Sequence, residues 1–305
     1  MTNAATARSV SLTTNLDHQL EQARELRKLA YDVILAEGLR DLTMAQRVGL
    51  AMFYRSLQTH EAIEILVKQK LVEDAQALVR VLVENEVNCA YMLIVGDEET
   101  AQDFVKHPRY KNYIVMRDLK AVDETRFRKQ VSVELEDETR KEYEALLPRY
   151  QNRRGEWCVD GKLHARAAKI DEKFAEFLKQ PYIEFRWLVN SSWRFNSSQV
   201  HGNADTLLEQ VSRREHEITI EQKYDPEDAA EALYIANLSL SLVLHLIDSL
   251  LGAKNAPKVI DRLKKFTGNI EQTQKGGWPR LNSEKRRVAG LRPHGRQSIV
   301  KSSGE

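Results

Sequence analysis

The stretch LVEDAQALVRVLVENEVNCAYML, residues 71–93, decides the fold class of this chain. Apolar residues lie on nearly every side of it. No proline or glycine interrupts it before Gly96, a residue typical of a helix C-terminus. A helix that is apolar almost all round belongs in the core of a protein. We therefore predict a buried helix over about residues 71–95, against which other helices pack.

The flanking segments carry the start signals of further helices. Asn15 is a good N-cap for a first helix, and Thr43 with Gln46 three residues later forms a capping box for a second. Later helices are expected over about residues 163–179, after Pro181, and over about 226–251.

A proline interrupts the middle of the chain. Because the residue before proline avoids the α region, His107-Pro108 is expected to end a short helix that begins near Glu98. Two charged helices are expected after this break, at about residues 109–130 and 136–152.

One segment, HEITIE at residues 216–221, alternates in the way that a strand does. We therefore expect at most one short strand or hairpin, near residues 214–222. The fold class that follows is all-α, with the helices arranged as an antiparallel bundle.

Composition predicts three parts. Residues 1–14 are rich in Ala, Ser and Thr and are expected to be a disordered lead, followed by a single helical domain over 15–267. Residues 268–305 hold eight Lys or Arg against three Glu, about +5 in a chain of net charge +1, and are expected to be a disordered basic tail. Such a tail can bind phosphate backbones, keep the protein soluble, bind a partner protein or have no function, and these alternatives stay open.

The cysteines and the missing motifs narrow the function classes. Two cysteines, Cys89 and Cys158, are too few for a disulfide framework or a zinc cluster and favour a reducing, cytoplasmic location. We expect no membrane span, because no apolar run approaches the roughly 18 residues that a span needs. The sequence has no glycine-rich phosphate loop or metal-ligand cluster, so no cofactor and no metal is expected.

A polar stripe crosses the central apolar helix. Arg80, Glu84 and Asn88 stand at i, i+4 and i+8 and therefore project from one face. Three interpretations stay open: an exposed ion pair, a buried structural ion pair, or a pocket that His60 and Tyr91 join.

A second polar segment, WLVNSSWRFNSSQVHGN, spans residues 187–203. Arg194 and His201 are seven residues apart, about two helical turns, so their side chains point in roughly the same direction. Ser197 and Ser198 lie between them, and Gly202 suggests that the helix ends at the histidine.

These two segments resemble a family of uncharacterised bacterial helical proteins. The likeness rests on the Arg-x-x-x-Glu helix at residues 71–93 and on WRFNSSQVHG at 193–202, and it covers roughly residues 50–252. Membership in that family implies a fold more than a function.

The Arg-x6-His spacing is also similar to the motif of HEPN proteins (higher eukaryotes and prokaryotes nucleotide-binding). This resemblance implies a small helical bundle, metal-independent endoribonuclease activity in a phage-defence or toxin–antitoxin system, and a dimer in which two motifs share one cleft. It implies catalytic roles for Arg194 and His201. The sequence departs from the motif at Phe195, where active members commonly carry Asn, Asp or His, and Asn196 follows one place later.

Two functions from different classes therefore stay open. The first is an RNase or RNA-binding effector, with Arg194 and His201 as catalytic residues and a supporting polar cluster of Arg80, Glu84, Asn88, Ser197 and Ser198. The second is a non-catalytic module that binds a neighbour-encoded protein or a second copy of itself. In the second case His201 is an ordinary helix-terminal or core histidine.

Overall fold

The computed structural model describes the backbone of residues 3–34, 42–178, 184–200, 211–214, 217–220 and 224–251. Side chains are described for residues 16–34, 42–173, 184–192 and 224–250. Over these ranges the chain is almost entirely helical, so the predicted all-α class is confirmed.

The hairpin of α2 (Met44–Lys68) and α3 (Val72–Ile94) forms the centre of the fold. The predicted capping box opens α2: the Thr43 hydroxyl accepts a hydrogen bond from the Gln46 N–H, and the Gln46 side chain accepts one from the Thr43 N–H. Gly49 allows the two helices to approach closely, because a Cβ there would lie 2.8 Å from Cγ of Leu93. The predicted buried helix is thus α3, within one residue at each end.

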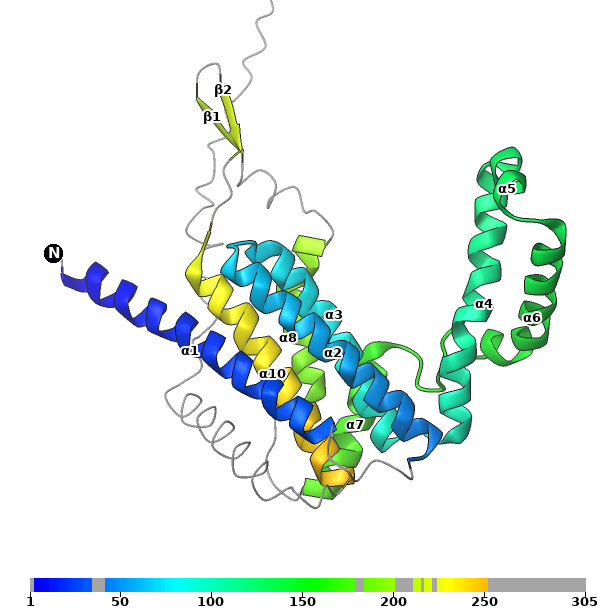
Figure 1. Cartoon of the computed structure of the whole chain (residues 1–305), viewed down its shortest axis with the longest axis horizontal. Helices are drawn as coiled ribbons and strands as arrows, with labels where there is room; N and C mark the ends of the chain where they lie inside the picture. The colour runs from blue at the N-terminus through cyan, green and yellow to red at the C-terminus, as the bar shows by residue number, and fades with distance from the viewer. Residues whose placement is uncertain are drawn as a thin grey trace, which may run out of the picture. The chain divides into compact units, whose positions relative to one another are not determined.

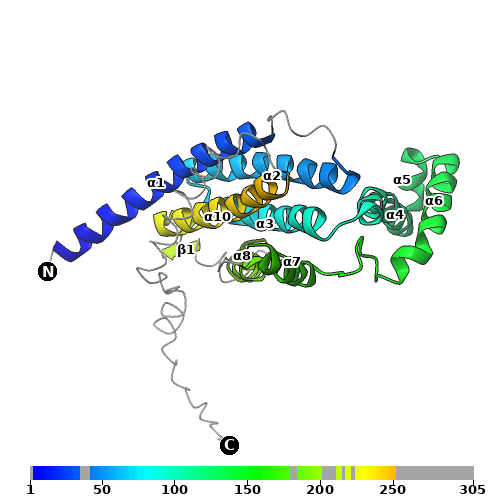
Figure 2. The same ribbon diagram turned by 90° about the horizontal axis from the view of Figure 1, so that it is seen from below.

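Four more helices complete the bundle around α3. They are α1 (Asn3–Ile34), α7 (Leu163–Leu178), α8 (Phe185–Val200) and α10 (Pro226–Leu251). Figure 2 shows three layers, with α1 and α2 in the first, α10 and α3 in the second, and α8 and α7 in the third. Since α3 contacts α2, α7, α8 and α10, it lies in the middle layer, and its core residues have no exposed surface: Val79, Leu82, Val83 and Val87.

Among the helices that the structure describes, α10 has the most apolar sequence. The helix over Pro226–Leu250 is long and apolar enough to cross a membrane. However, 83% of its most apolar 18-residue stretch is buried inside the protein. A helix packed on α1, α2 and α3 has this composition for the same reason that α3 does, since protein surrounds it.

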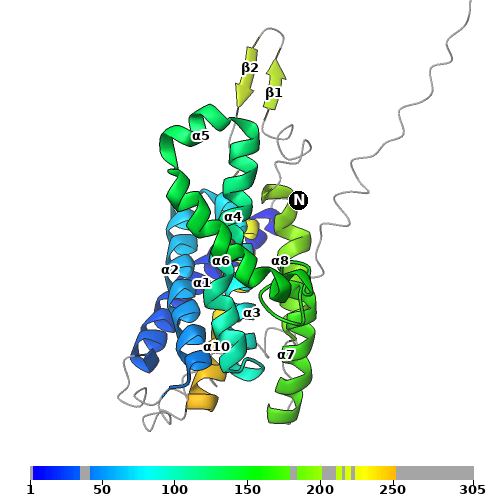
Figure 3. The same ribbon diagram turned by 90° about the vertical axis from the view of Figure 1, so that its right-hand side faces the viewer.

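The helices α4 (Glu98–Val122), α5 (Glu124–Gln130) and α6 (Val133–Gln151) form an arm that projects from the bundle (Figure 1). Each begins at a side chain that accepts a backbone hydrogen bond: Asp97, Asp123 and Ser132. Within the arm, α4 and α6 lie side by side (Figures 1 and 3).

The predicted break at Pro108 is wrong, because α4 continues through it. Proline removes one helical hydrogen bond and crowds the turn before it. In α4 this turn is supported from outside: the Tyr150 hydroxyl donates to the Asp103 carbonyl (2.7 Å), and His107 Nε2 bonds the Gly155 carbonyl (2.8 Å). Contacts with α6 and the loop after it thus stabilise the helix beyond its local preference.

The predicted hairpin and the predicted chain ends differ in their outcome. A short antiparallel hairpin, β1 (Val211–Arg214) and β2 (Glu217–Ile220), occupies the predicted region. The first helix begins at Asn3 rather than at Asn15, although the side chains of residues 1–15 lie outside the described part. The predicted tail, 268–305, lies outside the described residues, and the division into lead, body and tail stays a prediction.

Candidate functional site

The polar stripe on α3 lies at the border between the core and the surface. Glu84 is exposed, so it is not half of a buried ion pair, while Arg80 and Asn88 are half-buried. One guanidinium nitrogen of Arg80 and Oδ1 of Asn88 are fully buried. Among the described side chains, none is within hydrogen-bond reach of that Asn88 oxygen. The stripe therefore turns polar atoms inward from α3, a helix that packs against α7 and α8.

The second predicted segment belongs to α8. The backbone of Arg194, Ser197 and Ser198 is helical, but their side chains lie outside the described part, and His201 lies outside it altogether. Figures 1 and 3 show that α8 and α3 run in opposite directions, so the C-terminal half of α8 passes the N-terminal half of α3. The structure thus brings the two predicted helices together but does not place the Arg194 or His201 side chains.

The start of α8 is fixed by an aspartate on α7. Asp171, which is 4% exposed, accepts hydrogen bonds from the backbone N–H groups of Phe185 (2.7 Å) and Arg186 (3.1 Å), and pairs with the Arg186 guanidinium (3.1 Å). Burial raises the pKa of Asp171, and these hydrogen bonds oppose the rise. This carboxylate satisfies N–H groups that the first turn of a helix leaves free, and it thereby positions the helix that carries Arg194.

A histidine-centred network joins the first two layers of the bundle. His60 on α2 has no exposed surface; its Nε2 bonds Asn237 Oδ1 on α10 (2.9 Å), and its Nδ1 faces the Arg27 guanidinium on α1 (3.1 Å). Because the Asn237 amide nitrogen donates to Gln19, its oxygen must accept from His60. His60 is therefore the neutral Nε2–H tautomer, and burial together with Arg27 lowers its pKa to about 4.

Glu64, one turn further along α2, collects three cations. It pairs with Arg24 (3.1 Å), Arg27 and Lys68, and only 3% of its side chain is exposed. Burial alone would raise the pKa of Glu64, but the hydrogen bonds from Lys68 and Arg27 outweigh burial and lower it to about 2. Both ring nitrogens of His60 are hydrogen-bonded within this network, to Asn237 and Arg27, so His60 does not join the α3 stripe.

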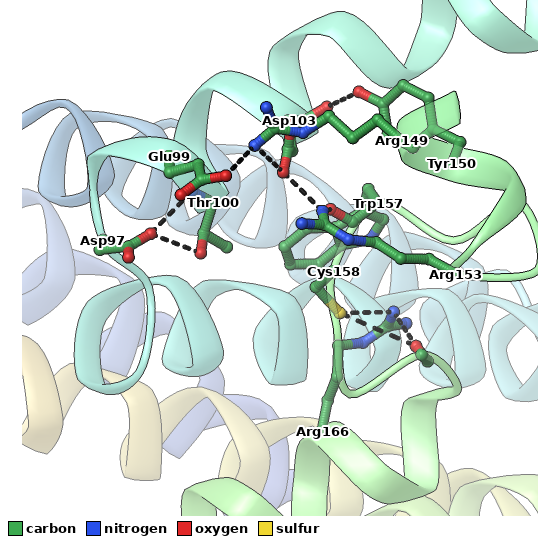
Figure 4. Close-up of polar contacts among 11 residues, drawn as sticks. Asp97, Glu99, Thr100, Asp103, Arg149, Tyr150, Arg153, Trp157, Cys158 and Arg166 are labelled. Atoms are coloured by element: carbon green, nitrogen blue, oxygen red, sulfur yellow. Dashed lines mark hydrogen bonds and ion pairs between the residues drawn. The ribbon is translucent and has the colours of Figure 1, made fainter. Parts of the chain in front are cut away.

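A further buried carboxylate fixes the base of the arm (Figure 4). Asp103 on α4 pairs with Arg149 on α6 and with Arg153 in the loop that follows (2.5 Å), and Arg149 also reaches Glu99 (2.6 Å). Burial raises the pKa of Tyr150, whose hydroxyl bonds the Asp103 carbonyl, to about 12. Asp103 is 1% exposed, whereas 35% of the Arg149 side chain and 68% of the Glu99 side chain are exposed, so this cluster is a structural junction built around a buried carboxylate.

The loop after α6 docks on the bundle through Trp157. Its ring meets Tyr91 and Phe104 edge-on, with centroids 5.7 and 5.1 Å away, and the Arg166 guanidinium lies 5.1 Å from the ring centroid. The Tyr91 hydroxyl donates to Asp160 (2.5 Å). Tyr91 therefore anchors this loop and, like His60, is not part of the stripe.

A carboxyl group lies in the core between α3 and α10. Glu86 has no exposed surface, and one of its oxygens accepts a hydrogen bond from Ser239. Burial raises the pKa of Glu86 well above its usual value, and the hydrogen bond from Ser239 opposes the rise. The neighbouring thiol, Cys89, is buried too, and burial raises its pKa.

Sequence reasoning missed the His60, Asp103 and Glu86 groups. Their partners come from helices far apart along the chain, 177 residues in the case of His60 and Asn237, and no spacing within one helix reveals such contacts. Over the described ranges, no group of three or more His, Cys, Asp or Glu side chains is arranged to hold a metal ion.

These features define an all-α bundle with a projecting helical arm and a half-buried polar stripe on α3. The chain belongs to a family of unknown function (DUF5677), which matches residues 46–218. This range runs from α2 to the hairpin and contains both segments singled out from sequence, so the expectation that the chain belongs to an uncharacterised family is confirmed. No curated protein and no solved structure matches the chain.

Proposed function

We propose that this protein is a metal-independent endoribonuclease, or an RNA-binding effector, of a bacterial defence or toxin–antitoxin system. Its site is the face shared by α8 and α3, with Arg194 and His201 as catalytic residues. RNA is the proposed partner, in the cytoplasm, together with a second copy of the chain or a neighbour-encoded protein.

The course of α8 is the observation that carries the proposal. It is one helix from Phe185 to Val200, fixed at its start by Asp171 and antiparallel to α3. Arg194 therefore lies on a helix that packs against α3, the helix of the Arg80 and Asn88 stripe, and the residue after Val200 is His201. The Arg-x6-His likeness to HEPN proteins then assigns the chemistry.

The proposed reaction is internal transfer at an RNA phosphodiester. The 2′-oxygen attacks the adjacent phosphorus, the bond from phosphorus to the 5′-oxygen breaks, and the products are a 2′,3′-cyclic phosphate and a 5′-hydroxyl. His201 acts either as the base for the 2′-hydroxyl or as the acid for the 5′-oxygen. One proton leaves and one is returned, so the step consumes no further reactant. The Arg194 guanidinium holds the phosphate oxygens as their charge develops.

The test is cleavage of single-stranded RNA by the purified full chain in the presence of a chelator. We expect cyclic-phosphate ends, and a loss of at least about a hundredfold in His201→Ala and in Arg194→Ala. His164→Ala, which changes an exposed histidine on α7, is the matched control and should retain full activity. Equal cleavage by His201→Ala would remove the assigned role.

A second candidate is the non-catalytic interaction module. The observation that favours it is the arm, on which several large apolar side chains are exposed, among them Val115 (54%), Leu119 (58%) and Val122 (86%). This candidate predicts no RNA cleavage and a stable complex with another protein. Growth during induced expression separates the two, since toxicity that disappears in His201→Ala favours the nuclease.

A further inference from the structure

The outer face of α4 carries an apolar stripe with the spacing of a coiled-coil seam. Its members are about half exposed or more: Val105 49%, Val115 54%, Leu119 58% and Val122 86%. In one heptad register with Leu119 at position a, Val105 is also at a, and Val115 and Val122 are at d. Exposed Pro108 and Asn112 fill the two remaining positions. We call these six residues the outer stripe.

The outer stripe lies on the side of α4 opposite to α6. At 3.6 residues per turn, the stripe is about half a turn away from Asp103 and Tyr110. Both of those residues are buried: Tyr110 stacks on Tyr143 (5.1 Å) and Asp103 pairs with Arg149. The apolar side chains of the stripe therefore do not hold the arm together, and they remain available to another helix.

We propose that the outer stripe binds the same stripe of a second copy of this chain, as an antiparallel pair of α4 helices. This inference goes beyond the proposed nuclease and does not depend on it.

Self-complementarity in residue pairing and in charge argues for a second copy as the occupant. When Asn112 lies beside Val115 of the second copy, Pro108 lies beside Leu119, and Val105 lies beside Val122. In this register Lys111 of each copy meets Asp118 of the other. Both residues are exposed and flank the seam, at g positions, where charged pairs set orientation. Asp118 also pairs with Arg117 of its own helix (3.0 Å).

The polar position of the seam limits the affinity of the pair. In this register Asn112 lies beside Val115 of the second copy rather than beside a second asparagine, so its burial costs affinity. With Asn112 and Pro108 in a short seam, the dimer is expected to be reversible. It should be measured over a dilution series.

The first experiment is sedimentation equilibrium of the full chain. Wild type should dimerise, and Val115→Glu with Leu119→Glu should weaken the dimer at least about a hundredfold, because it buries charge in an apolar seam. The matched control is Val133→Glu with Leu135→Glu on α6, two apolar residues of equal exposure (54% and 50%) outside the stripe. Circular dichroism should show that both double variants are folded. A monomeric wild type, or equal effects of the two variants, would overturn the proposal.

The second experiment tests orientation. Lys111→Glu and Asp118→Lys should each weaken the dimer about fivefold, and the double variant should restore it. Val105→Cys with Val122→Cys should form an intermolecular disulfide, whereas Val122→Cys alone should not. The native thiols do not interfere, since Cys89 and Cys158 are both buried. Cross-linking through Val122→Cys alone would mean that the helices run parallel, and the antiparallel register would be wrong.

Discussion

The bundle and the arm distribute polar and apolar side chains in opposite ways. In the bundle, polar groups such as His60, Glu64 and Asn237 lie inside and are matched to partners on other helices. In the arm, most ion pairs lie on the surface, and apolar residues such as Leu119 are exposed beside them. The inside of the bundle therefore fixes one arrangement of helices, whereas the outer face of the arm is suited to contacts with other molecules.

The largest expected effect comes from breaking the buried ion cluster of the bundle. Glu64→Ala removes the carboxylate shared by Arg24, Arg27 and Lys68 and leaves Arg27, only 12% exposed, without this counter-charge. We expect a loss of about 3 to 4 kcal/mol in the free energy of unfolding, measured by urea denaturation. The control is Glu61→Ala, which removes an exposed side chain one turn earlier on α2. A loss for Glu64→Ala no larger than the control's would show that the cluster does not stabilise the bundle.

The next effect is the dependence of stability on pH. Because the pKa of His60 falls from 6.5 to about 4 on folding, the unfolded chain binds more protons between these values, and stability is lost as pH falls through this window. The expected loss is about 3 kcal/mol from pH 7 to 4. Below pH 4.5, Glu64, whose pKa is lowered to about 2, adds a further loss.

The variant His60→Gln isolates the contribution of the histidine. Its unfolding free energy, measured by urea denaturation at several pH values, should vary less with pH between 6.5 and 4.5 than that of wild type. Parallel pH profiles for the two proteins would mean that His60 is not held neutral in the folded state.

A smaller effect is expected at the helix that carries the predicted motif. Asp171→Ala removes the acceptor for the first N–H groups of α8, at Phe185 and Arg186, and should cost about 1 to 2 kcal/mol in urea denaturation. The adjacent Glu172→Ala changes an exposed residue that pairs with Lys169 on the surface, and should cost much less. If the proposed nuclease is active, Asp171→Ala should also reduce RNA cleavage, since α8 would no longer be held at its start.

The same comparison explains how much of the fold could be predicted from sequence. Helices whose signals are local were found correctly: the Thr43 capping box opens α2, and α10 spans the predicted residues 226–251. The continuous helix through Pro108 was missed because its support comes from Tyr150 and Gly155, more than forty residues away. A local rule does not include contacts of that kind.

For the site, the sequence could select residue types and faces but not environments. The stripe of Arg80, Glu84 and Asn88 was found, yet its burial, with Glu84 outside and Asn88 Oδ1 inside, depends on which helices pack against α3. The roles of Arg194 and His201 stay predictions. The stripe on α4 was readable as apolar residues at heptad spacing, but the break expected at Pro108 concealed it.

The smallest expected effect concerns the surface ion pairs of the arm. Arg109 on α4 and Glu142 on α6 lie 3.2 Å apart, with 62% and 41% of their side chains exposed. Water and salt screen such a pair, so a double-mutant cycle of Arg109→Ala and Glu142→Ala should give a coupling energy of only about 0.2 to 0.5 kcal/mol, smaller still at high salt. A coupling above about 1.5 kcal/mol would mean that the arm relies on its surface charges much as the bundle relies on its buried ones. In that case the stacked tyrosines between α4 and α6, Tyr110 and Tyr143, would not be enough to hold the arm together.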